Sequence, residues 1–215
     1  MNKQFDQWNN FYKNNKTRHY DNWLEKYSDY VSQNLNGYII DLGCGNGGNS
    51  FFLFNKGCKI IACDYSSEAI NNVKLLNKEI DTRTIDFTEP LPFENNFAYI
   101  VIADLVLHYF TENKTKMILD EIHRITGDGG FLFARVNSTK DYNFGAGQGD
   151  EIEKNYYYNT GRFKRFFDEK MIDEIFIDSK WEKLNVSEYS IDRYEQKEKV
   201  LWEIILKKRG NRLDL

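Results

Sequence analysis

The sequence predicts an α/β fold: a doubly wound, mostly parallel seven-stranded sheet with helices on both faces and a C-terminal antiparallel strand pair. From residue 37 onward, short and almost wholly apolar runs alternate with helical patterns, as in parallel sheets that are covered on both faces. The last two strand-like runs are joined by a short link and are therefore expected to pair antiparallel. Hydrophobic residues make up 41% of the 215 residues and aromatic residues 16%, which is enough for a packed core and excludes intrinsic disorder.

The first 36 residues are expected to form a helical cap, because bulky side chains recur there on one face of a 3.6-residue period. Strands are predicted next at Tyr38–Leu42, Cys58–Cys63, Thr82–Ile85 and Phe97–Ala103. One intervening helix is expected over Asn49–Lys56. A second begins at Ser66 or Ser67 as its N-cap, with Ala69, Val73 and Leu76 facing inward.

An amphipathic helix over Thr111–Thr126 is expected to stop at Gly127-Asp128-Gly129-Gly130, which precedes a strand over Phe131–Val136. Residues 138–167 break the alternation and predict a lid or hairpin insertion, with a flexible segment at Gly145–Gly149. A helix over Asp168–Ile177 and strands over Glu182–Arg193 and Lys199–Lys208 complete the pattern. We expect residues 1–215 to form a single domain.

Charge and cysteine content narrow the class of protein. The 29 basic and 33 acidic side chains give a net charge of −4, so a nucleic-acid groove is not expected. Three cysteines without a C-x-x-C pair favour a reducing, cytoplasmic setting. There is no signal-peptide pattern and no membrane span, because the longest apolar stretch, Tyr99–Phe110, contains Asp104 and His108. A monomer or homodimer is expected.

Carboxylates lie at the carboxyl ends of four of the predicted parallel strands. Asp41, Asp64 and Asp86 are each separated by one strand-plus-helix unit, and Asp104 ends the fourth strand. Ligands of open parallel sheets bind outside the carboxyl ends of the strands. The sequence therefore predicts a ligand site with an acidic rim.

The turn after the first strand, Gly43-Cys44-Gly45-Asn46-Gly47-Gly48, satisfies the pattern G-x-G-x-x-G, which lets a backbone approach a nucleotide-like ligand. Asp41 precedes it by two residues, where a carboxylate repels a pyrophosphate but attracts an ammonium or sulfonium group. At ~4 Å and an effective dielectric constant of ~20, such a charge contact is worth roughly 4 kcal/mol before desolvation. Because this charge interaction is attractive for a sulfonium and repulsive for a pyrophosphate, it favours S-adenosylmethionine over a dinucleotide.

The run Ile39-Ile40-Asp41-Leu42-Gly43-Cys44-Gly45-Asn46-Gly47 resembles the first motif of the class I, Rossmann-like S-adenosylmethionine-dependent methyltransferases. Asp64-Tyr65-Ser66 resembles their second acidic motif, and Asp86-Phe87 their adenine-contacting turn. Ala103 to Tyr109 resembles their fourth-strand motif, and Gly127 to Gly130 the turn before their fifth strand. Within the family, small enzymes related to tellurite-resistance methyltransferases look nearest. The resemblance implies a methyltransferase of the small-molecule type.

The resemblance also implies roles for individual residues. Asp41 and the backbone of the glycine-rich turn would hold the methionine part of the cofactor, and Asp64 would accept hydrogen bonds from the ribose hydroxyls. Tyr65 would lie against adenine. Asp86 and the Phe87 backbone would bind the adenine edge, and Ala103 would offer a carbonyl group. Asp64 and Asp86 are alternatively helix or turn caps. The implied cofactor-binding residues are Asp41, Gly43, Cys44, Gly45, Asn46, Asp64, Tyr65, Asp86, Phe87 and Ala103.

Methyl transfer from a sulfonium is an in-line displacement that depends chiefly on alignment, so no metal is required. None is indicated, because His19, His108 and His123 share no ligand spacing with cysteine or with each other. His108 is the candidate base, or alternatively a packing residue. Candidate substrate contacts are Tyr12, Arg18, Asp104, Tyr157 and Arg162; Asp104 is alternatively a cofactor contact or a loop anchor.

Two other functions stay open. An NAD(P)-linked oxidoreductase would share the glycine pattern but is disfavoured by Asp41 and by the terminal antiparallel strand pair. A non-catalytic module that binds S-adenosylmethionine would carry the same cofactor residues. A nucleic-acid methyltransferase is disfavoured by the acidic charge, and because no Asn/Asp-Pro-Pro-aromatic motif follows the fourth strand. We therefore expect a small-molecule methyl acceptor as the partner, with no nucleic acid and no membrane.

Overall fold

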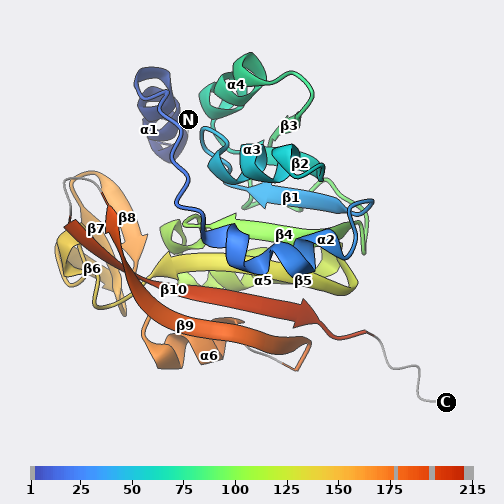
Figure 1. The fold of residues 1–215 in the computed structure, drawn as a ribbon. Helices are drawn as coiled ribbons and strands as arrows, with labels where there is room; N and C mark the ends of the chain where they lie inside the picture. Colours follow the sequence, from blue (N-terminus) through green and yellow to red (C-terminus); the bar gives the residue numbers. More distant parts are fainter. Residues whose placement is uncertain (1–2, 177–178, 194–196, 211–215) are drawn as a thin grey trace. The chain divides into compact units, whose positions relative to one another are not determined.

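Seven strands form one sheet in the order β3-β2-β1-β4-β5-β10-β9, and a smaller sheet has the order β6-β7-β8 (Figure 1). The parallel strands run outward from β1 in both directions, which confirms the doubly wound pattern. The structure, a computed structural model, describes residues 3–176, 179–193 and 197–210. By its internal contacts the chain divides into two units, Met1–Ile102 with Ile125–Gly127, and Ala103–Arg124 with Asp128–Leu215.

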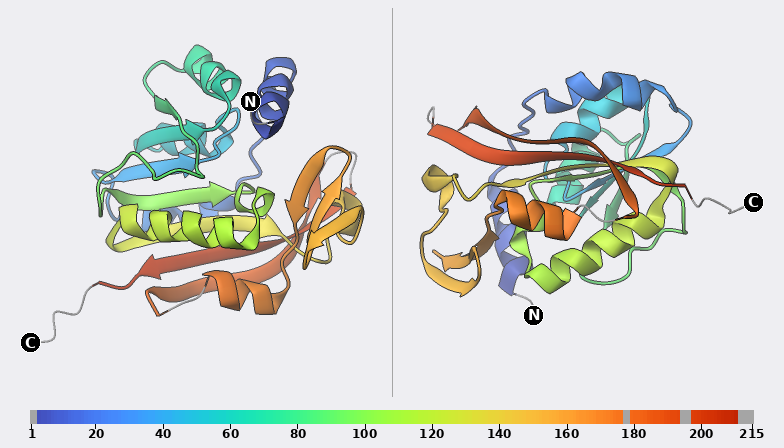
Figure 2. Two further views of the ribbon diagram at one scale, coloured as in Figure 1. Left: turned by 180° about the vertical axis from the view of Figure 1, so that it is seen from behind. Right: turned by 90° about the horizontal axis from the view of Figure 1, so that it is seen from below.

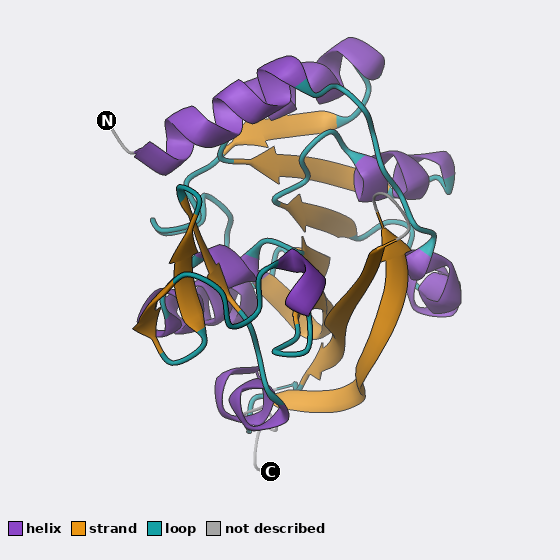
Figure 3. Ribbon diagram, turned by 90° about the vertical axis from the view of Figure 1, so that its left-hand side faces the viewer, coloured by secondary structure: helices purple, strands orange, loops and turns teal. Residues whose placement is uncertain are grey.

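Parallel strands form the centre of the first unit. β1 (Tyr38–Leu42) pairs with β2 (Lys59–Asp64) on one side and with β4 (Ala98–Asp104) on the other. β3 (Asp81–Thr84) pairs in parallel with β2. The apolar side chains of β1, β2 and β4 are nearly all buried, as burial on two faces requires. Figure 3 looks onto the carboxyl ends of these parallel strands, the edge at which the sequence predicts the ligand site.

Helices before and between these strands complete the first unit: α1 (Lys3–Asn14), η1 (Trp23–Tyr27), α2 (Ser28–Ser32), α3 (Gly48–Asn55) and α4 (Ser67–Leu76). The Oγ of Ser66 caps α4 by accepting from the Ala69 N–H at 3.2 Å. The prediction that Leu76 faces inward is wrong. Leu76 is the last residue of α4 and is 57% exposed, because Ala69, Ile70 and Val73 already cover the inner face.

Antiparallel strands dominate the second unit. β10 (Lys197–Lys208) pairs antiparallel with both β5 (Thr126–Asn137) and β9 (Trp181–Arg193), which confirms the predicted terminal strand pair. α6 (Glu169–Phe176) lies beside this long ribbon (Figure 2). Ile177, predicted to end that helix, lies outside the described residues. The inward face predicted for α5 (Glu112–Ile125) is confirmed by the burial of Ile118, Ile122 and Ile125.

The glycine run after α5 belongs to a strand. Gly127 to Gly130 were predicted as a turn before the strand, but β5 begins at Thr126, directly after the helix. Of this run, Gly129 takes a left-handed φ of 71°, which glycine adopts without strain.

The insertion after β5 contains a three-stranded antiparallel sheet. β6 (Asp150–Glu153) pairs with β7 (Tyr156–Asn159), which turns at Thr160 and Gly161 into β8 (Arg162–Arg165). Two single turns of 3-10 helix also lie in this unit, η2 (Leu107–Tyr109) after β4 and η3 (Tyr142–Phe144) after β5. None of the described helices is long and apolar enough to cross a membrane.

Candidate active site

The glycine-rich turn between β1 and α3 is held tightly against β2. The N–H groups of Gly43 and Cys44 both donate to the carbonyl oxygen of Cys63, at 2.8 and 2.9 Å. Gly45 has a φ of 53°, and a Cβ at this position would lie 2.8 Å from the Tyr12 hydroxyl oxygen. A side chain at Gly48 would meet the His19 carbonyl oxygen at 2.1 Å. Both positions therefore require glycine, because other parts of the chain approach the turn closely.

Asp64, at the end of β2, anchors this turn. Its Oδ2 accepts from the Gly45 N–H at 2.9 Å, and its Oδ1 accepts from the Ser66 N–H at 2.8 Å. The residue is 7% exposed, and burial raises the pKa of its carboxyl group to about 6, although both N–H groups oppose that shift. Each carboxylate oxygen can accept more than one hydrogen bond, so Asp64 keeps capacity for a ligand while it holds the turn.

Asp41 lies beneath the turn, inside β1. It is 1% exposed, and its Oδ2 accepts from the Ser50 hydroxyl at 2.5 Å, which ties the strand to the first turn of α3. The turn also contains Cys44, whose thiol pKa is raised by burial and then by the charges of Asp64 and Asp41. Two buried carboxylates thus make the surroundings of the turn negative, which favours a cationic ligand group.

The residues predicted around adenine lie after β2 and β3. Tyr65 is half-buried next to Asp64. Asp86 caps its own turn, because its Oδ1 accepts from the N–H and the hydroxyl of Thr88, at 2.8 and 2.7 Å. The Phe87 side chain is buried in the core. Asp86 therefore acts as a turn cap through its Oδ1. The residue as a whole is half-buried.

The N-terminal residues predicted to contact substrate also lie at the glycine-rich turn. Tyr12 presents its hydroxyl oxygen to Gly45. The Arg18 guanidinium stacks over the Phe51 ring at 4.3 Å. Asn46, predicted as a cofactor residue, donates its amide to the carbonyl oxygens of Asn15 and Thr17, at 2.8 and 3.0 Å. Its side chain therefore holds the segment that follows α1.

In the second unit, the candidate residues lie at the end of β4 and in η2, and Asp104 is tied to β5. Ala103 is fully buried. Asp104 accepts a two-pronged pair of hydrogen bonds from Arg135, and its side chain is 16% exposed. His108 is buried in η2, with its ring 4.2 Å from that of Tyr109. The loop-anchor alternative thus describes the main contact of Asp104.

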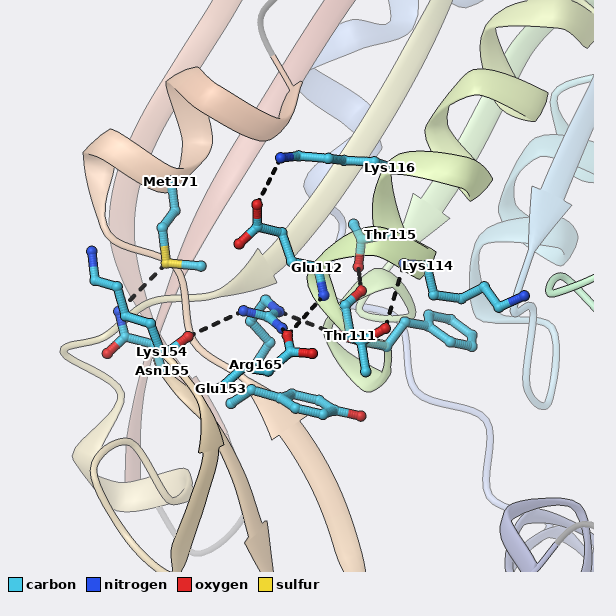
Figure 4. Close-up of polar contacts among 12 residues, drawn as sticks. Thr111, Glu112, Lys114, Thr115, Lys116, Glu153, Lys154, Asn155, Arg165 and Met171 are labelled. Atoms are coloured by element: carbon cyan, nitrogen blue, oxygen red, sulfur yellow. Dashed lines mark hydrogen bonds and ion pairs between the residues drawn. The ribbon is translucent and has the colours of Figure 1, made fainter.

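The small sheet holds the last two candidates and a buried arginine. Tyr157 in β7 is half-buried opposite Lys164, and Arg162 in β8 is exposed. Arg165 is fully buried, and its polar contacts are drawn in Figure 4. It forms an ion pair with Glu153 and donates to the carbonyl oxygens of Phe110 and Lys154, at 3.3 and 3.1 Å. This arginine fastens the sheet to the segment after η2.

Three buried polar residues were not predicted from the sequence: Asn72 in the first unit, and Arg135 and Arg165 in the second. A charge inside the apolar run of residues 131–136 is a signal for a buried ion pair, and it would have found Arg135. Asn72 offers no comparable signal, because it is one polar residue in an amphipathic helix. Among the described residues, no cluster of three or more His, Cys, Asp or Glu side chains is arranged to hold a metal ion.

Residues 39–130 match the model of a protein family described as the methyltransferase domain. The matched segment includes the glycine-rich turn, Asp64, Asp86 and Asp104. Over this segment the chain is similar to methyltransferase domains.

The chain is similar in sequence to a tRNA (carboxymethyluridine(34)-5-O)-methyltransferase of Arabidopsis thaliana, with 32% identity over 99 residues that cover 46% of this chain and 23% of the relative. The chain spans about half or less of the length of the curated relatives that it matches.

Solved structures share the fold over most of the chain. An S-adenosylmethionine-dependent methyltransferase of Methanosarcina mazei has a TM-score of 0.75 at 17% identity, over 90% of this chain and 99% of that one. TehB of Haemophilus influenzae has a TM-score of 0.64 at 17% identity, over 88% of this chain and 67% of that one. The likeness in fold to these methyltransferases therefore extends beyond residues 39–130.

Proposed function

We propose that this protein is an S-adenosylmethionine-dependent methyltransferase that acts on a small-molecule acceptor. The observation that carries the proposal is the pair of buried carboxylates at the glycine-rich turn, with Asp64 bonded to the Gly45 N–H and Asp41 beneath it. A pyrophosphate would meet two negative charges there, whereas an ammonium or sulfonium group would be attracted. The methyltransferase family match supports this choice of ligand.

The chemical groups at the turn suit the parts of S-adenosylmethionine that they would bind. Asp41, Gly43, Cys44 and Gly45 would hold its methionine part, and the remaining acceptor capacity of Asp64 suits two ribose hydroxyls. Tyr65 would cover adenine, while Asp86 and Phe87 would bind its edge. In the second unit, Ala103 would contribute its carbonyl oxygen.

When bound, S-adenosylmethionine supplies a methyl group that is activated by a sulfonium. The contribution of the chain is to bind and align, and alignment alone can lower the barrier by several kcal/mol. Tyr12 and Arg18 would close the site against water from the N-terminal side. His108 would accept the proton of an oxygen or nitrogen acceptor, and a thiolate acceptor would need no base.

A small-molecule acceptor is supported by charge. The chain carries a net charge of −4, which does not favour binding to a polyanion. The positive charge of Arg135 is buried and paired with Asp104. Asp104, Tyr157 and Arg162 would contact the acceptor. We also propose a cytoplasmic location, which suits the three cysteines, because all are free and buried.

A tRNA acceptor is the second candidate, and the relative from Arabidopsis thaliana favours it. Incubation with methyl-labelled S-adenosylmethionine separates the two. The proposal expects label in a low-molecular-weight product from a metabolite extract and none in total tRNA. Label in tRNA that is removed by ribonuclease would establish the second candidate. Cofactor binding without transfer to either pool would favour a non-catalytic module.

A further inference from the structure

The chain from the middle of α1 to residue 17 lies against the glycine-rich turn, and we call residues 9–17 the strap. At its start, the Asn9 Oδ1 accepts from the Ser66 hydroxyl at 2.8 Å and from the Glu68 N–H at 3.3 Å, at the beginning of α4. At its end, Asn15 and Thr17 accept from the side-chain amide of Asn46. The strap is therefore fastened at both ends to elements that frame the candidate cofactor site.

Asn72 joins the strap to the turn at the midpoint. This residue of α4 is 5% exposed, and its amide donates to the Tyr12 carbonyl oxygen and to the Asn46 Oδ1, both at 3.0 Å. An asparagine amide has two N–H donors, so these two bonds use both of them. One side chain thus fixes the backbone of the strap and the orientation of Asn46 within the turn.

The side chains of the strap lie near the surface. None of the described side chains of residues 6–17 is buried in the core. Trp8 and Tyr12 stack on each other, with ring centroids 5.9 Å apart. A segment held by side-chain hydrogen bonds, with few buried apolar contacts, opens locally at low cost. Loss of one asparagine should therefore loosen the strap without unfolding the sheet.

We infer that Asn72 is a positioning residue for cofactor binding, which holds the strap closed over the glycine-rich turn. The inference rests on the proposed function. In the closed arrangement the Tyr12 hydroxyl reaches Gly45, so the strap covers the turn to which we assign the methionine part of the cofactor. Asn72 acts on the ligand through Tyr12 and Asn46 and does not touch it.

The test compares Asn72→Ala with Asn71→Ala, which removes an exposed asparagine from the same helix. Binding of S-adenosylhomocysteine is measured by calorimetric titration, and hydrogen exchange of the strap is measured with and without that ligand. We expect Asn72→Ala to weaken binding about tenfold, through the loss of two hydrogen bonds, and to abolish ligand-induced protection of the strap. Asn71→Ala should match the wild type in both measurements.

A second variant, Asn9→Ala, opens the strap without touching the turn and covers the case in which Asn72→Ala does not fold. We expect it to weaken binding roughly threefold, through the loss of its hydrogen bonds to α4, and to speed exchange in the strap. If the wild type binds and both soluble variants bind equally well with unchanged protection, the inference fails while the proposed function stands. If the wild type does not bind, the proposed function fails, and the inference fails with it.

Discussion

Arg135 donates to both carboxylate oxygens of Asp104, from Nε to Oδ1 at 2.8 Å and from Nη2 to Oδ2 at 3.0 Å. Burial makes this pair a fixed part of the second unit, because the Arg135 side chain is 3% exposed. The polar cluster continues through Tyr189, whose hydroxyl donates to the buried Glu203 at 2.8 Å. The end of β4 is thus held by a charge from β5, and a buried polar contact between β9 and β10 lies in the same sheet.

Replacing Arg135 with Met should destabilise the protein by about 3 kcal/mol, because it leaves the Asp104 charge without its cation. Urea unfolding measures the loss. The control is Lys170→Ala, which removes an exposed partner of Glu174 and should change stability by less than about 0.5 kcal/mol. Equal effects of the two substitutions would show that the pair is not structurally important.

Gly45→Ala should destabilise the protein by about 1–2 kcal/mol, because alanine is strained at a φ of 53° and its Cβ would meet the Tyr12 hydroxyl oxygen. In a Tyr12→Phe background the nearest ring atoms lie 3.4 Å away, so the same substitution should cost less. A double-mutant cycle measured by thermal unfolding checks this coupling. Strict additivity would contradict the contact.

Cofactor affinity should rise with pH through about 6, because burial raises the pKa of Asp64 to about 6 and only the ionised form accepts from both ribose hydroxyls. Titration with S-adenosylhomocysteine at pH 5, 6, 7 and 8 measures the profile. In Asp64→Asn, affinity should be weaker throughout and this pH step should vanish. A step that persists in the variant would belong to another group.

The contribution of Asp64 to folding stability should change with pH in the opposite direction to cofactor affinity. The pKa of Asp64 is higher in the folded protein than its unfolded value of about 3.9, so the folded state binds more protons between about pH 4 and pH 6. The contribution of Asp64 to stability therefore falls as pH rises through that window. Denaturant unfolding of the wild type minus that of Asp64→Asn isolates the slope, and a difference that increased with pH would refute the assignment.

His108→Ala should lower turnover with little change in cofactor affinity, if His108 acts on the acceptor proton. The comparison needs kcat with the acceptor identified by the labelling experiment and the Kd for S-adenosylhomocysteine. Unchanged turnover would remove His108 from the mechanism. His108 is buried, so thermal unfolding must first establish that the variant is folded at the assay temperature.

The sequence predicted the parallel sheet and its edge well, because those features are local. Apolar runs mark strands buried on two faces, and the spacing of Asp41, Asp64 and Asp86 brings them to the same edge. The bonding partners could not be predicted in this way. The pairing of Asp104 with Arg135, and of Asn72 with Tyr12, joins residues far apart in the chain. The glycine run at Gly127 could not be assigned either, because glycine permits both a turn and an extended strand.

The most direct test of the central claim is calorimetric titration of the protein with S-adenosylhomocysteine, S-adenosylmethionine and NADH, with Asp64→Ala as the companion variant. We predict micromolar binding of both methionine-derived ligands, loss of that binding in the variant, and no heat from NADH. Binding of NADH in place of the methionine-derived ligands would contradict it, because the carboxylates at the glycine-rich turn would then accommodate a pyrophosphate.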